Sequence, residues 1–164
     1  MKKSSKSILS VLINCGLLLT GALTLFFLSQ GYYKMTILGV SEYAAGYDMI
    51  DFSADEGRAV MTAISILAIV ILVSLAIILT IVNFLSDVNA IKLSKKANKA
   101  LRALNLCFIF AIFAFSVIAL GCIASLAGEI GFTSVGWALI VNLIVSAVMF
   151  ILAIVSVSCA KKTK

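Results

Sequence analysis

The chain has 164 residues, of which 63% are apolar or aromatic and 12% are charged, and it contains neither proline nor histidine. Soluble proteins have roughly 45–50% apolar and roughly 25% charged residues, so this composition excludes a soluble globule. The absence of histidine excludes histidine-ligated haem and histidine-based hydrolysis. The formal net charge is +6, and its meaning depends on where the charges lie.

Four segments are apolar enough and long enough to cross a membrane, which takes about 20 residues. They contain no Asp, Glu, Lys or Arg, and they are Ile8–Leu28, Ala59–Leu85, Ala103–Ala127 and Val135–Ala160. We therefore expect an all-α integral membrane protein, a single domain over residues 1–164 folded as an antiparallel four-helix transmembrane bundle. A cleaved signal peptide is the alternative for the first segment, but its apolar run exceeds the roughly 7–15 residues that signal peptides use.

The connection after the first segment, about residues 30–58, is predicted to be the larger outer loop. It holds all four tyrosines and five of the seven acidic residues. Tyr32 and Tyr33 are expected to anchor the membrane interface, as is Trp137 before the fourth segment. The rest of the loop fits a packed cap or interfacial helix, a contact surface for another protein, or a weak cation site. The residues expected to make an outer-loop contact are Tyr43, Tyr47 and Phe52.

The connection between the second and third segments, about residues 86–102, is short and basic. Ser86 and Asp87 resemble a helix start, and apolar side chains follow at helical spacing. We expect a cytoplasmic amphipathic turn whose cations contact anionic lipid headgroups. These cations are Lys92, Lys95, Lys96, Lys99 and Arg102.

The charges also predict the orientation of the chain. Eleven of the thirteen cations lie in this loop and in the two terminal segments, whereas six of the seven acidic residues lie in the two outer connections. The positive-inside rule therefore places both termini in the cytoplasm, and the plasma membrane is the expected location. A nucleic-acid surface is the weaker interpretation, because the cations border the spans, where lipid headgroups are nearest.

Polar residues inside the spans predict contacts between helices. Asn14, Asn83 and Asn105 are expected in the cytoplasmic third of the bilayer, where they could meet as interhelical hydrogen-bond partners or line a vestibule for a solute. Such a bond contributes about 0.6–2 kcal/mol. Small side chains that recur every four residues predict helix-packing faces. These are Gly16, Thr20, Thr24, Gly121, Ser125, Ala138, Asn142 and Ser146.

No catalytic or metal-ligating constellation stands out in the sequence. The four cysteines form no C-x-x-C pair, and the spans carry no ionisable residue of the kind that proton-coupled transporters use. We expect no enzymatic activity, no metal and no cofactor. The expected function is association, as an accessory subunit or an oligomer-forming protein, with the outer loop contacting a membrane-protein partner or a second copy. The alternative is an oligomeric channel or transporter for a neutral or hydrophobic solute, lined by the span asparagines.

Overall fold

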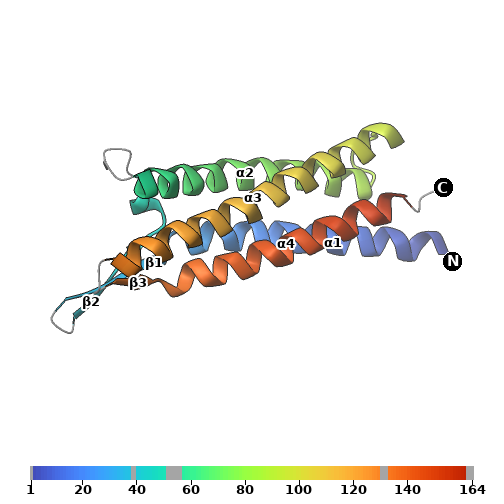
Figure 1. Ribbon diagram of the computed structural model, residues 1–164. Coiled ribbons are helices and arrows are strands. Elements are labelled where there is room, and N and C mark those ends of the chain that lie inside the picture. Colours follow the sequence, from blue (N-terminus) through green and yellow to red (C-terminus); the bar gives the residue numbers. More distant parts are fainter. Residues whose placement is uncertain (1, 38–39, 51–56, 130–132, 162–164) are drawn as a thin grey trace.

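The computed structural model describes residues 2–37, 40–50, 57–129 and 133–161. Four long helices run side by side (Figure 1): α1 (Lys2–Leu28), α2 (Gly57–Asp87), α3 (Lys95–Glu129) and α4 (Trp137–Lys161). Each helix is long and apolar enough to cross a membrane, so the predicted multi-pass helical architecture is confirmed. Both chain ends and the α2–α3 turn lie at one end of the bundle, here named the terminal end.

Successive helices pack against one another, and α1 also packs against α4, which closes the bundle. Its interior is built from side chains such as Leu17, Ile66, Ile112 and Met149, one from each helix, all fully buried. The outside is also apolar, with exposed residues on every helix that include Leu19, Ile78, Phe110 and Ile144. An apolar exterior around an apolar core is the surface that lipid tails would cover.

The α2–α3 turn differs from the sequence prediction, because Ser86 and Asp87 end a helix and do not start one. Asn89 adopts a left-handed backbone conformation with a φ of 59°. The Ala90 amide donates to the Leu85 carbonyl at 2.9 Å, and the Asn89 amide donates to the Ser86 carbonyl at 3.2 Å. This pattern is a Schellman cap, for which asparagine is a suitable residue. The next helix begins after Ser94, whose hydroxyl oxygen caps the Ala97 amide at 3.1 Å.

The other end of the bundle carries a small sheet, and we name it the sheet end. The strands are β1 (Gly31–Ile37), β2 (Val40–Ala45) and β3 (Thr133–Val135), antiparallel in the order β2-β1-β3. A one-turn 3-10 helix, η1 (Tyr47–Met49), follows β2. The outer loop was expected to be a packed cap or interfacial helix, a contact surface, or a weak cation site. Its described part is mainly a β-hairpin and not a helix, and β1 of the hairpin also pairs with β3 from the second outer connection.

An irregularity in β1 fastens the sheet to the bundle. Gly31 pairs with Ala45 and Tyr33 pairs with Ala44, so Tyr32 is an extra residue in the ladder. A bulge of this kind redirects a side chain, and Tyr32 is fully buried. The Gly136 amide donates to the Tyr32 carbonyl at 2.7 Å. A Cβ atom on Gly136 would overlap the backbone of Gly31 and Tyr32, so only glycine allows this approach.

Candidate functional site

An ion pair between a buried arginine and a part-buried aspartate lies near the terminal end of the bundle. Arg102 Nη2 on α3 lies 2.5 Å from Asp87 Oδ1 on the last residue of α2. Arg102 was expected to contact lipid headgroups, but only 4% of the residue is exposed. The structure therefore separates Arg102 from the four lysines of that set. Burial with a carboxylate partner is how a cation is accommodated at a low-dielectric position.

Hydroxyl and amide groups complete this pair from the two remaining helices. Ser10 Oγ and Asn14 Nδ2 on α1 each donate to Asp87 Oδ2 at 2.7 Å. Arg102 Nη1 donates to Ser10 at 3.1 Å and to Ser156 on α4 at 2.9 Å. Arg102 Nε donates to Asn98 Oδ1 at 2.8 Å. We name Ser10, Asn14, Asp87, Asn98, Arg102 and Ser156 the polar clamp, and it joins all four helices.

The two charged groups of the clamp have little capacity left for a ligand. The two Asp87 oxygens together accept three donors, and the Arg102 guanidinium makes four hydrogen bonds. Charge-assisted bonds of this kind are the stronger class. The arrangement therefore holds the helix ends together and does not resemble a binding site with free charged groups.

The three span asparagines are buried in the interior of the same half of the bundle. Asn14 belongs to the clamp, whereas Asn105 donates to Thr80 Oγ1 at 2.9 Å. Thr80, Asn83 and Asp87 share one face of α2 by their helical spacing. No hydrogen bond joins these asparagines to one another among the described residues, and each has an amide oxygen with no protein donor. Such oxygens normally accept a hydrogen bond, commonly from internal water.

The predicted packing residues divide into two groups. Thr20, Thr24, Ala138, Asn142 and Ser146 are buried, and a Cβ atom on Gly16 would lie 3.1 Å from the Leu152 side chain on α4. Gly121 and Ser125 are exposed in the single chain, and a Cβ atom on Gly121 would meet open space. Ser125 accepts a hydrogen bond from Arg58 Nη1 on α2 at 2.8 Å.

Tyr32 makes a second buried polar contact, at the sheet end. It was expected to anchor the membrane interface, but its ring points into the core and its hydroxyl accepts a hydrogen bond from Asn142 Nδ2 on α4. Burial raises the pKa of the Tyr32 phenol and outweighs the opposing effect of that hydrogen bond. Trp137, in contrast, is half exposed beside Phe27.

The β1–β2 hairpin presents exposed side chains at the sheet end. Val40 is 65% exposed and Tyr43 is 53% exposed. Tyr47, after β2, is also exposed and donates its hydroxyl to the Leu25 carbonyl at 3.3 Å. The third predicted contact residue, Phe52, lies outside the described residues.

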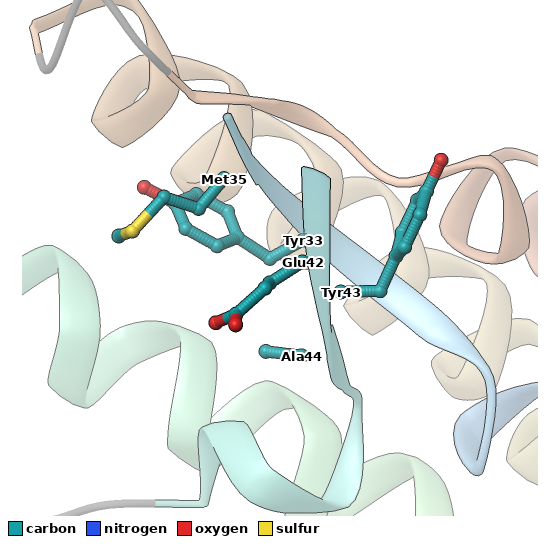
Figure 2. A pocket seen from close by; sticks show the side chains of 5 residues that line it. All are labelled: Tyr33, Met35, Glu42, Tyr43 and Ala44. Atoms are coloured by element: carbon teal, nitrogen blue, oxygen red, sulfur yellow. The ribbon is translucent and has the colours of Figure 1, made fainter. Parts of the chain in front are cut away.

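The two faces of the hairpin differ in chemistry. Figure 2 shows Tyr33, Met35, Glu42 and Ala44 on one face and Tyr43 directed away from the other. The cross-strand pairs agree with this arrangement, because Met35 lies opposite Glu42 and Lys34 lies opposite Tyr43. Lys34 Nζ lies 5.9 Å from the centre of the Tyr43 ring, within range of a cation–π contact.

A scan against protein-family models, a search of curated proteins and a search of solved structures found no match to this chain. The functional interpretation therefore depends on the geometry of the clamp and the hairpin.

Proposed function

We propose that this chain is a non-enzymatic multi-pass membrane protein that acts by association, as an accessory subunit or an oligomer-forming protein, through its β1–β2 hairpin. The observation that carries the proposal is the position of β2. It lies at the edge of the sheet, pairs with β1 on one side only among the described strands, and exposes its first four side chains. An exposed edge strand offers unpaired backbone groups to another chain.

The anchoring of the hairpin supports this role. Tyr32, the bulge residue of β1, inserts its side chain into the bundle, and the Gly136 amide donates a hydrogen bond to its carbonyl. A contact surface held on a rigid base loses less conformational entropy on binding than a free loop does. The clamp at the opposite end contributes a fixed arrangement of the four helices.

The proposed location is the plasma membrane, with the terminal end in the cytoplasm and the hairpin on the outer side. Four exposed lysines, Lys92, Lys95, Lys96 and Lys99, surround the α2–α3 turn. They are proposed to contact anionic headgroups of the inner leaflet.

A second candidate function is the passage of a neutral or hydrophobic solute. It is supported by the unpartnered amide oxygens of Asn14, Asn83 and Asn105, which could receive a hydrogen-bond donor. These residues are buried within one bundle, so the path would run between the helices of a single chain and would require the clamp to open. Unchanged solute flux through reconstituted vesicles after Asn105→Leu would reject this route.

The association proposal is tested by the mass of the purified protein. The full chain, solubilised in mild detergent at native expression level, is expected to elute with a second protein or as a multimer by light scattering. Replacing Val40 and Tyr43 with Glu should reduce this mass to that of one chain. Leu19→Ala, at an exposed position on α1, is the control and should leave the assembly intact. Glu is not used at this position, because it would place a charge in the lipid. A single-chain mass for the unmodified protein would refute the proposal.

A further inference from the structure

Glu42 is the only acidic residue in β1 and β2, and Lys34 is their only cation. Glu42 makes no side-chain hydrogen bond or ion pair within the part of the chain that the structure describes. Lys34 cannot neutralise it, because Lys34 lies on the opposite face beside Tyr43. The hairpin therefore presents one unmatched carboxylate on an exposed strand.

Apolar side chains lie next to the exposed Glu42. A shallow hollow of about 190 Å³ is lined by Glu42 together with Tyr33, Met35, Tyr43 and Ala44. In Figure 2 the Glu42 side chain lies on the same side of the strands as Met35, Tyr33 and Ala44. Tyr33 also packs against the buried core, which holds this wall of the hollow in place.

The chemistry of this hollow matches a long basic side chain. Lys and Arg have apolar stems that lie along apolar surface and a charged head that remains near solvent. The stem would contact Met35 and Tyr33, while the head would reach the Glu42 carboxylate. A neutral apolar side chain would use the same walls but would leave the carboxylate unmatched.

The free edge of β2 determines how such a side chain can be delivered. A strand that adds to this edge hydrogen-bonds to the β2 backbone, and the residue opposite Glu42 projects on the same face of the sheet as Glu42. Every second side chain of the added strand would therefore face the hollow. The residue of the added strand that lies opposite Glu42 is nearest the carboxylate, so β2 should prefer strands with a basic residue there.

We propose that β2 binds an extended segment of a different protein, which pairs with its free edge and places a Lys or Arg side chain opposite Glu42. A second copy of this chain fits less well, because β2 contains no basic residue that could lie opposite Glu42 when two β2 strands pair. This inference rests on the proposed association through the hairpin and adds the class of partner.

The test uses synthetic peptides and the purified full chain in neutral detergent, with binding measured by fluorescence anisotropy. The probe is a short peptide that alternates Thr and Val and has Arg at its centre; matched peptides have Gln or Glu there. We expect the Arg peptide to bind about two- to fivefold more tightly than the Gln peptide, the range of one exposed ion pair. The preference should decrease with added salt.

Variants of the protein identify the carboxylate responsible. Glu42→Gln should abolish the preference for the Arg peptide, and Glu42→Lys should reverse it in favour of the Glu peptide. Asp48→Asn is the charge-matched control. Asp48 accepts a hydrogen bond from the Ala45 amide at 3.2 Å, and an Asn side chain can still accept it, so the preference should persist.

A backbone-modified peptide tests strand addition separately. The Arg peptide with N-methyl groups on alternate amides keeps its charge but cannot donate those hydrogen bonds, and we expect it to lose binding. Retained binding would overturn strand addition. Equal affinity for the three peptides, or no binding of any of them, would overturn the proposed class of partner. The proposed function would still be supported in that case if the assembly mass depended on the hairpin. An assembly mass insensitive to Val40 and Tyr43 would instead reject the proposed function itself.

Discussion

Arg102 and Asp87 lie 15 positions apart on either side of the α2–α3 turn, and their side chains meet at 2.5 Å inside the bundle. Among the residues that the structure describes, Asp87 is the one acidic residue at the terminal end, and it pairs with Arg102, the one buried cation there. The remaining lysines there stay exposed. The pair thus allows a helix that begins in the basic turn to enter the apolar bundle.

Removal of one member of this pair should destabilise the bundle strongly. Arg102→Met leaves the part-buried Asp87 without its countercharge, and we expect a loss of about 3 kcal/mol in the free energy of unfolding, the lower end of the range for buried pairs. Equilibrium unfolding in micelles, followed by circular dichroism, measures this change. Lys99→Met, an exposed cation one turn away, should change stability by less than about 0.5 kcal/mol.

The double variant tests the ion pair itself. Arg102→Met combined with Asp87→Leu removes both charges, and we expect it to recover most of the stability that Arg102→Met loses. Additive losses from the two substitutions would show that the pair is not coupled.

Tyr32 should make stability depend on pH in the alkaline range. Because burial raises the phenol pKa above its ordinary value of 10.0, the folded state keeps this proton while the unfolded state releases it. The contribution of the neutral phenol is complete below about pH 10 and is lost as pH rises further. Unfolding measured across this range in the natural protein and in Tyr32→Phe should show the difference, with a smaller alkaline loss in the variant. Parallel curves for the two proteins would contradict the buried placement of the hydroxyl.

Gly136 and Gly121 provide a comparison between a glycine in close backbone contact and a glycine beside open space. Gly136→Ala would force a Cβ atom into the β1 backbone, and we expect destabilisation of at least about 1–3 kcal/mol with loss of the sheet. Gly121→Ala meets open space within α3 and should stabilise the helix by about 0.5–1 kcal/mol. Thermal unfolding of both variants provides the comparison. Equal and small effects would indicate that β1 and Gly136 are not in close backbone contact.

The orientation can be tested by cysteine labelling in intact cells. Val40→Cys should react with a membrane-impermeant maleimide added outside, whereas Lys92→Cys should react only after the membrane is opened. The four native cysteines are first replaced by Ala to remove their background. Labelling of Lys92→Cys from outside would reverse the assignment.

The helices were the most predictable part of the fold. Long apolar runs without proline dictate membrane-length helices, and the structure contains them. The clamp was not predicted, because Arg102 resembles its neighbouring lysines in sequence and only the α2–α3 turn brings it to Asp87. The signal for that turn was Asn89, a residue type that tolerates the left-handed conformation.

The hairpin had a weaker signal in the sequence. Tyr33 and Thr36 belong to a run of strand-forming residues, and a second run begins at Val40 after Leu38 and Gly39. Scattered acids in the rest of the loop obscured this pattern. The inward placement of Tyr32 depends on a one-residue bulge, and the pairing with β3 depends on a distant segment, so local sequence could not predict either.

Crosslinking in the native membrane tests association through the hairpin most directly. A photoreactive amino acid at Val40 should form a protein adduct of higher mass upon illumination, and the yield should fall in the Tyr43→Glu variant. The same group at Ile78, which is exposed on the apolar surface of α2, should form lipid adducts only. A Val40 sample that yields no protein adduct, or an adduct whose yield is unchanged by Tyr43→Glu, would contradict the proposed role of the hairpin.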